Sequence, residues 1–425
     1  MNIKEEARKM KLAAPKAANT SIEIRNQALT AIADSLEAHA EEIYAANHED
    51  LAAAEENGIA AAVKKRLKFD EGKLADVLSG IRQLISLPDP LGRVQLHRAL
   101  DDDLELYRIT CPIGVIGVIF EARPDALVQI STLCIKSGNC AILKGGKETA
   151  KTNKALFKLI KKAATEAGMP EDCLLQAEQH NEIDELLSCD KEVDLLIPRG
   201  SNAFVQYIMN HTKIPVMGHA DGICHIYVDK DADQEKAIPI LLDAKTQYTA
   251  ACNAVETILV DREIAGEFLP KLGKTFAENG IQLRGSAEAA DILACERMAD
   301  DEFATEYLDL IASVKLVSGV EEAAEHINRF GSHHTDAIVT ENQETAEYFM
   351  RMVDSAGVYQ NCSTRFADGY RYGFGAEVGI STGKIHARGP VGLEGLITYK
   401  YKLYGHGNIV GDYASGKRTF KHRDL

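Results

Sequence analysis

Residues 139–168 read NCAILKGGKETAKTNKALFKLIKKAATEAG, a short apolar run followed by a long helical pattern. The same order recurs nearby: GVIGVIF (114–120) precedes a helix-like stretch from Asp125 to Lys136, and VDLLIPRG (193–200) precedes SNAFVQYIMNHT. Such alternation with nearly continuous apolar strands is typical of a parallel sheet covered by helices on both faces. The sequence therefore predicts an α/β fold, and such sheets bind ligands at the carboxyl ends of their strands.

The rest of the chain extends this pattern in both directions. The first ninety residues show helical spacing of apolar positions. RVQLHRALDDDLELYRI (93–109) then alternates apolar and polar residues around DDD, which predicts a hairpin or a long edge strand. The run HIYVD (225–229) closes the first series, and a second αβ series begins near Lys230. The tail returns to alternation with aromatic residues.

Composition disfavours several classes of protein. The 425 residues carry a net charge of −16, so a nucleic acid or an anionic membrane has no global electrostatic support as a partner. No apolar run approaches the roughly 18 residues of a membrane helix, and the N-terminus lacks a signal-peptide core, so we expect a cytoplasmic protein. The nine cysteines are irregularly spaced without a CxxC, which disfavours both a disulfide framework and a structural zinc site.

One cysteine stands apart from the others. The segment YTAACNAVETILVD (248–261) places Cys252 at the mouth of an apolar run, beside Asn253 and among alanines. Small neighbours leave room for a substrate, and loop amides would stabilise an oxyanion formed on attack. A nucleophile and an inert core cysteine both fit this pattern. No Cys–His pair is readable at a motif spacing, which disfavours a protease.

Several segments would suit an anion, and each also has an ordinary structural explanation. Lys144 and Lys147 flank a glycine pair at a strand end, as in a phosphate site or a solvated turn. Gly200 and Ser201 lie between a strand and a helix, where they would bind phosphate or form an N-cap. A cationic loop that would bind an anion or face solvent contains Arg365, Lys384, His386 and Arg388. The three histidines of HINRFGSHHTD (326–336) show no clear metal-ligand spacing, so we expect structural or polar roles and no metal.

In this order the motifs resemble the aldehyde dehydrogenase superfamily, and most closely its acyl-phosphate-reducing branch in proline biosynthesis. YTAACNAVETILVD is similar to the nucleophile loop, and HINRFGSHHTDAI, NCSTRFADG and STGKIHARGPVGLEGL are similar to further segments, with Phe330 where histidine or tyrosine is usual. The resemblance implies an aldehyde dehydrogenase-like α/β fold: two Rossmann-like parallel-sheet domains plus a small β oligomerisation arm. The implied division is a cofactor-binding domain of residues 1–93 and 109–229, a catalytic domain of residues 230–395, and an arm of residues 94–108 and 396–425.

The resemblance also implies roles for individual residues. Cys252 is the expected thiol nucleophile, and its own amide and the Asn253 side chain are candidate oxyanion donors. The expected cofactor-binding residues are Lys144, Lys147, Gly200, Ser201 and Glu306. The expected substrate-binding cations are Arg123, Arg365, Lys384, His386 and Arg388.

Two departures from the oxidising members of the superfamily bear on the reaction. Ala122 replaces an asparagine that completes the oxyanion hole, and His219 replaces the glutamate that activates water. A reductase forms its thioester by expelling phosphate, and water would only waste that intermediate, so the second departure fits a reductase. Lys147 stands where members that use NAD often place a glutamate, which favours NADP(H) as the cofactor.

The implied reaction is the NADPH-dependent reduction of L-glutamyl 5-phosphate to L-glutamate 5-semialdehyde through a cysteine thioester. The implied partners are further copies of this chain, in a dimer or tetramer built through the arm, and transiently glutamate 5-kinase. Two alternatives stay open. One is a hydrolytic or CoA-acylating aldehyde dehydrogenase, and the other is a binding or scaffold protein on a decayed enzyme fold.

Overall fold

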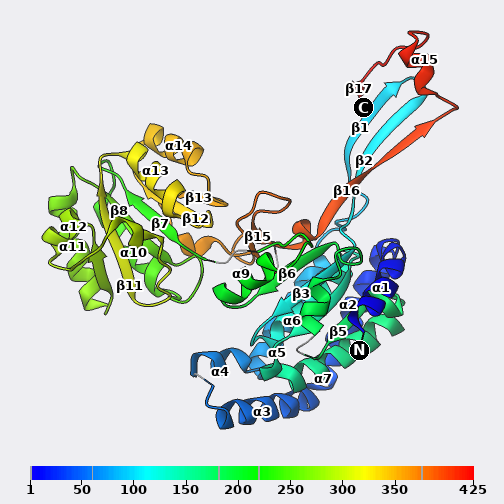
Figure 1. Ribbon diagram of the computed structural model, residues 1–425, viewed down its shortest axis with the longest axis horizontal. Coiled ribbons are helices and arrows are strands. Elements are labelled where there is room, and N and C mark those ends of the chain that lie inside the picture. Colours follow the sequence, from blue (N-terminus) through cyan, green and yellow to red (C-terminus); the bar gives the residue numbers. More distant parts are fainter. Residues whose placement is uncertain (1, 60, 180–181, 219–220, 375–376) are drawn as a thin grey trace. The chain divides into compact units, whose positions relative to one another are not determined.

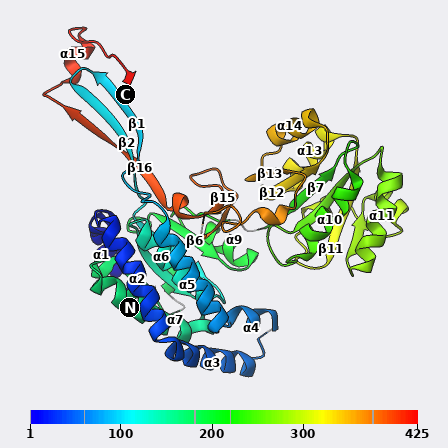
Figure 2. The same cartoon turned by 180° about the vertical axis from the view of Figure 1, so that it is seen from behind.

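The computed structural model describes residues 2–59, 61–179, 182–218, 221–374 and 377–425 (Figures 1 and 2). The chain divides into two compact units. The first contains residues 1–217, 374–379 and 391–425, and the second contains residues 218–373 and 380–390.

The first unit is built on a four-stranded parallel sheet of order β5-β4-β3-β6. Every residue of β3 is buried, as its continuous apolar run predicts. In α7 the buried positions Leu156, Leu159, Ile160 and Ala163 follow helical spacing, and lysines occupy the outer face. The strands are β3 (Val115–Phe120), β4 (Cys140–Gly145), β5 (Leu174–Ala177) and β6 (Leu195–Arg199). The helices are α1 (Ile3–Ala18), α2 (Ile22–Ala38), α3 (Ala40–Glu56), α4 (Ala61–Leu67), α5 (Glu71–Ser86), α6 (Pro124–Lys136), α7 (Ala150–Glu166), α8 (Glu182–Leu187) and α9 (Asn202–Asn210).

The second unit is built on a seven-stranded parallel sheet of order β10-β9-β11-β8-β7-β12-β13. Successive residues of β8 enter different cores: Ile258 packs in the core formed with α10, α11 and α12, and Leu259 in the core formed with α13 and α14. Helices therefore cover both faces, as the sequence predicts. The strands are β7 (Cys224–Val228), β8 (Val255–Asp261), β9 (Gln282–Gly285), β10 (Glu296–Arg297), β11 (Ile311–Val317), β12 (Thr335–Val339) and β13 (Gly357–Gln360). The helices are α10 (Gln234–Thr246), α11 (Ala265–Glu278), α12 (Ala287–Leu293), α13 (Val320–Phe330) and α14 (Gln343–Met352).

The predicted domain boundary needs correction. The strand of residues 225–229 was assigned to the first series, but β7 pairs in parallel with β8 and β12 of the second sheet. Alternation along the chain predicts a strand without saying which sheet it joins, so the boundary falls near residue 218 rather than 230. Residues 391–395, predicted in the catalytic domain, belong to the first unit.

The predicted arm is an antiparallel sheet of order β16-β2-β1-β17 within the first unit. The DDD sequence turns the chain between β1 (Val94–Asp101) and β2 (Leu104–Pro112), which confirms the hairpin. β16 (Ile397–Gly405) pairs with β2 over its whole length, and α15 (Val410–Ala414) and β17 (Arg423–Asp424) complete the tail. A two-stranded ribbon, β14 (Gly379–Ser381) and β15 (Gly389–Val391), precedes it in the chain.

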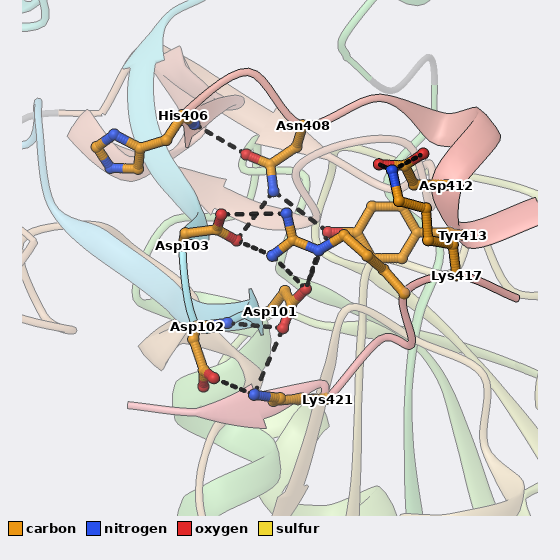
Figure 3. A network of polar contacts seen from close by, with 10 residues as sticks. Asp101, Asp102, Asp103, His406, Asn408, Asp412, Tyr413, Lys417 and Lys421 are labelled. Carbon is orange, nitrogen blue, oxygen red and sulfur yellow. Dashed lines mark hydrogen bonds and ion pairs between the residues drawn. The ribbon is translucent and has the colours of Figure 1, made fainter.

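Charged and polar side chains fasten the tail to the tip of this hairpin (Figure 3). Arg418 Nε donates to Asp101 Oδ2 at 2.9 Å, and its guanidinium also pairs with Asp103. Asn408 Nδ2 donates to Asp103 at 2.9 Å, and Lys421 pairs with Asp102 (Figure 3). Hydrogen bonds from Arg418 and Asn408 lower the pKa of Asp103 to about 2. The aspartates that turn the chain therefore also hold its C-terminal segment.

Candidate active site

Cys252 lies in the loop between α10 and β8, at the amino end of β8. Its Sγ lies 3.2 Å from Nε2 of His334, which directly precedes β12. His334 is fully buried, and its Nδ1 lies 2.9 Å from Thr335 Oγ1, which fixes the orientation of the ring. Cys252 is half-buried. The geometry allows the imidazole to accept the thiol proton and then donate to the thiolate.

This pair is not readable from the sequence. The two residues are 82 positions apart, and the histidine segment had been given only structural or polar roles. They meet because β8 and β12 flank β7 in the sheet, so that the amino ends of these strands lie at one edge. The position of a histidine immediately before a buried parallel strand was the one available signal.

Backbone packing around Cys252 is tight. Gly222 lies against it so closely that a Cβ at Gly222 would stand 2.1 Å from the Cys252 carbonyl oxygen. The Gly222 amide donates to Glu306 Oε1 at 3.0 Å. Glu306, the predicted ligand of the nicotinamide ribose, therefore lies next to the nucleophile loop in the second unit.

Asn253, the predicted oxyanion donor, is buried and already hydrogen-bonded to other residues. Its Nδ2 donates to the Ala367 carbonyl at 2.8 Å, and its own carbonyl accepts from Thr364 Oγ1 at 2.7 Å. One hydrogen of its amide group is thus committed to holding the 361–369 segment. His219, the other residue at which the chain departs from the oxidising enzymes, lies outside the described residues.

The predicted substrate cations occupy different surroundings. Arg365 is buried, and its Nε donates to Gln247 Oε1 at 2.9 Å. Burial lowers the pKa of Arg365, as does Arg371, whereas Cys252 nearby raises it. Lys384 and Arg388 both pair with Asp354, at 2.6 and 3.0 Å. Arg365 therefore lies within electrostatic reach of the Cys252 thiol.

The two other substrate candidates belong to different units. His386 is exposed in the segment that carries Lys384 and Arg388. Arg123 is half-buried and belongs to the first unit, where it precedes α6.

The predicted cofactor residues of the first unit gather at the carboxyl edge of its sheet. Lys144, near the end of β4, is 4% exposed, and its Nζ donates to the Gly145 carbonyl at 2.7 Å. Burial lowers the pKa of Lys144, while Glu182 and Glu148 raise it. Lys147 is exposed and begins the short 3₁₀ helix Lys147–Thr149. A buried ammonium bonded to a neutral carbonyl is well suited to an anionic ligand.

Two carboxylates accept hydrogen bonds from backbone amides at the carboxyl ends of these strands. Glu121 Oε2 accepts from the Ser201 amide at 3.0 Å, at the N-terminus of α9. A Cβ at Gly200 would stand 2.4 Å from the same oxygen. Glu148 Oε1 accepts from the Ala122 amide at 2.9 Å. The edge therefore binds negative charge close to the backbone, which is what a pyrophosphate requires.

Two further features bear on the class of protein. Within the described ranges, no group of three histidine, cysteine, aspartate or glutamate side chains is arranged to hold a metal ion. In the same part of the chain, every helix is too short or too polar to cross a membrane.

Known proteins match the chain over most of its length. The family model for the aldehyde dehydrogenase family matches residues 1–292. A gamma-glutamyl phosphate reductase of Pelotomaculum thermopropionicum is 55% identical over all of this chain and 98% of the relative, and one of Ruminiclostridium cellulolyticum is 54% identical with the same coverage.

Solved structures agree with the sequence relatives. The crystal structure of a gamma-glutamyl phosphate reductase from Thermotoga maritima is 36% identical, covers 96% of this chain and 100% of that one, and has a TM-score of 0.93. An acetylating aldehyde dehydrogenase from Geobacillus thermoglucosidasius is 17% identical, with a TM-score of 0.64 over 96% and 97% of the two chains, a likeness of fold alone. These matches confirm the predicted aldehyde dehydrogenase-like α/β fold.

Proposed function

We propose a function on the premise that the chain belongs to the aldehyde dehydrogenase family and, within it, to the gamma-glutamyl phosphate reductases. It reduces L-glutamyl 5-phosphate to L-glutamate 5-semialdehyde and releases phosphate, the second step of proline biosynthesis from glutamate. The observation that carries the proposal is the Cys252 thiol, half-buried and 3.2 Å from the His334 imidazole.

The chemistry begins with the thiol proton. His334 Nε2 accepts the proton from Cys252 Sγ, and the thiolate attacks the acyl carbon of the substrate. The carbon–oxygen bond to phosphate breaks, phosphate leaves with its electron pair, and a thioester forms on Cys252. Arg365 and the imidazolium supply positive charge beside the sulfur in both its thiolate states, before attack and after the aldehyde departs.

Positive charge from side chains is needed here because of the local helix geometry. The loop of Cys252 follows the C-terminus of α10, and His334 follows the C-terminus of α13. Helix C-termini carry partial negative charge and disfavour a thiolate. The buried Arg365 and His334 offset that effect. The backbone amide of Cys252 and the second hydrogen of the Asn253 amide are the proposed donors to the oxyanion.

NADPH, when bound, supplies the hydride that reduces the thioester carbonyl. The surroundings of Lys144, Gly200 and Ser201 fit its phosphates, because a buried ammonium lies there and the Ser201 amide already donates a hydrogen bond to a carboxylate. Lys147 would pair with the 2′-phosphate that distinguishes NADP from NAD. Glu306 would accept from the hydroxyls of the nicotinamide ribose. Arg123 and the segment with Lys384, His386 and Arg388 would bind the anionic groups of the substrate.

The arm supports the proposal of a homo-oligomer. β16 lies at an edge of the arm sheet and exposes Tyr399, Tyr401 and Leu403, each about half or more of its surface. An exposed edge strand with large apolar side chains is a surface that another strand or chain would cover. We propose a dimer or tetramer built through this arm, transient contact with glutamate 5-kinase, and a cytoplasmic location.

The test uses the reverse reaction. With L-glutamate 5-semialdehyde and NADP, we expect NADP reduction only when phosphate or arsenate is present as the acyl acceptor. Rapid NADP reduction in phosphate-free buffer, with glutamate as product, would instead identify a hydrolytic dehydrogenase. Dependence on CoA would identify an acylating one, and absence of turnover with every acceptor would favour a binding protein.

A further inference from the structure

A second polar pair lies at the base of the nucleophile loop. Lys245 is in the last turn of α10, and Glu256 is the second residue of β8. Lys245 Nζ and Glu256 Oε2 are 2.7 Å apart, and both side chains are fully buried. The pair thus joins the two ends of the segment that contains Cys252.

Stability gives no reason for this pair. Removing two charges from water costs several kcal/mol per ion, and replacing a buried ion pair by apolar residues of similar volume is often neutral or stabilising. The cost is visible in the two groups themselves. Burial raises the pKa of Glu256 to about 7 and lowers the pKa of Lys245, and each group opposes the shift of the other. The acidic side chain of Glu306 raises the pKa of Glu256 further. Asp309 and Glu306 also raise the pKa of Lys245 and so oppose the effect of burial.

The pair also contacts the segment that carries Glu306. The Leu308 amide stabilises the charged form of Glu256, although Glu256 Oε1 has no hydrogen-bond partner of good geometry in the described chain. Leu308 has a φ of 54°, a strained backbone for a leucine, two residues after Glu306. Glu306 accepts from the Gly222 amide, and Gly222 lies against Cys252. Contacts therefore run from Lys245 through Glu256, the 306–308 segment and Gly222 back to the nucleophile.

We propose that Lys245 and Glu256 are positioning residues for Cys252, holding both ends of its loop and the Glu306 segment so that the sulfur faces His334. This inference rests on the proposed role of Cys252 as the nucleophile. Neither residue touches the substrate. Without the pair, the loop shifts, and the thiol loses the imidazole that takes its proton.

The experiment compares a charge-free pair with the parent enzyme. In Lys245→Met/Glu256→Met, apolar side chains fill the same space, so the melting temperature should be equal or higher. We expect the rate of Cys252 alkylation by iodoacetamide, followed by peptide mass spectrometry at pH 7, to fall about ten- to a hundredfold. The kcat should fall in parallel, with the KM for glutamate semialdehyde changed less. Lys236→Met is the matched control, because Lys236 is an exposed lysine of the same helix, paired with Glu341 at 3.0 Å.

A folded double variant with alkylation and turnover within twofold of the parent would overturn the inference and make the pair purely structural. If the double variant does not fold, Glu256→Gln decides, since it keeps the volume and removes the charge: an unchanged alkylation rate overturns the inference, and a tenfold loss supports it. Alkylation needs no substrate. Its outcome is therefore separate from the proposed function, which fails if Cys252→Ala keeps its turnover.

Discussion

The two parallel sheets carry their candidate residues at different ends of their strands, the first at the carboxyl ends and the second at the amino ends. In the first unit, Lys144, Gly200 and Ser201 lie at the carboxyl ends of β4 and β6, just before the N-termini of helices. In the second unit, Cys252 and His334 lie before the amino ends of β8 and β12, in the loops that follow α10 and α13. Helix N-termini stabilise anions, whereas helix C-termini disfavour them.

This difference explains where each unit obtains its positive charge. The first unit offers backbone amides and helix N-termini to an anion, and its own Glu121 carboxylate accepts a hydrogen bond from one of those amides. The second unit needs buried cationic or protonatable side chains near the thiol, and it has Arg365 and His334. Changes at Cys252 and His334 should therefore abolish turnover, and changes at Lys144 and Lys147 should lower cofactor affinity.

The strongest test of this contrast is Cys252→Ala. We expect turnover to fall about a thousandfold or more, because the covalent route is lost. NADPH affinity, measured by fluorescence titration, should stay within twofold. Cys362→Ala, at another half-buried thiol, is the control and should keep most of its activity. Near-normal turnover of Cys252→Ala would show that the reaction needs no thioester.

His334→Ala should have the next largest effect. Loss of the proton acceptor should lower kcat by about 10²- to 10⁴-fold and leave NADPH affinity unchanged. The control is His333→Asn, because His333 bonds the Asp354 carbonyl through Nδ1 and has a φ of 60° that asparagine tolerates. Equal losses in the two variants would indicate disruption of the loop and not loss of a specific imidazole.

Lys147→Glu tests the proposed cofactor site of the first unit. The variant should lose NADPH efficiency about ten- to a hundredfold more than NADH efficiency, since one charge-assisted hydrogen bond contributes about 1.5–3 kcal/mol. Lys144→Ala should weaken both cofactors, and neither variant should slow alkylation of Cys252. The matched control is Lys162→Glu, at an exposed lysine of α7. Equal losses with both cofactors in Lys147→Glu would remove the basis for preferring NADP.

The sequence predicted the fold better than the site. Continuous apolar runs identified β3, β4, β6, β7 and β8, because strands buried on both faces have few polar positions. The short strands β9 and β10 were not identified, since they are partly or largely exposed and have no such run. The sheet that β7 joins depends on pairing across the fold, which local pattern does not contain.

For the site, motif resemblance selected Cys252 and Arg365, and the structure places both in one unit near each other. The partners of Cys252 were not predictable in the same way. His334 and Gly222 reach the thiol only through the sheet order β8-β7-β12. Lys245 and Glu256 are 11 positions apart in the sequence, and their pairing appears only once α10 packs on β8.

His326 differs from the other buried polar side chains discussed for the second unit, because it has no hydrogen-bond partner among the described residues. It is 5% exposed, and both ring nitrogens have no hydrogen-bond partner among the described residues. The rings of Phe303, Phe330 and His225 surround it at 5.2, 4.6 and 5.5 Å between centroids. Burial lowers the pKa of His326 from 6.5 to about 2, with smaller effects in the same direction from His225, Lys315 and Arg329.

The sign of the pH effect follows from that shift. Below pH 6.5 the unfolded chain binds a proton at residue 326 and the folded chain does not, so stability is full above pH 6.5 and falls as the pH drops toward 2. At pH 5.5 the loss from this residue is about 1.4 kcal/mol. In His326→Phe this loss is absent. The free energy of unfolding in urea, relative to the parent, should therefore rise by about 1.4 kcal/mol between pH 7.5 and 5.5. The same exchange at the exposed His48 should show no such rise, and parallel pH profiles for the parent and His326→Phe would mean that the folded protein protonates this ring.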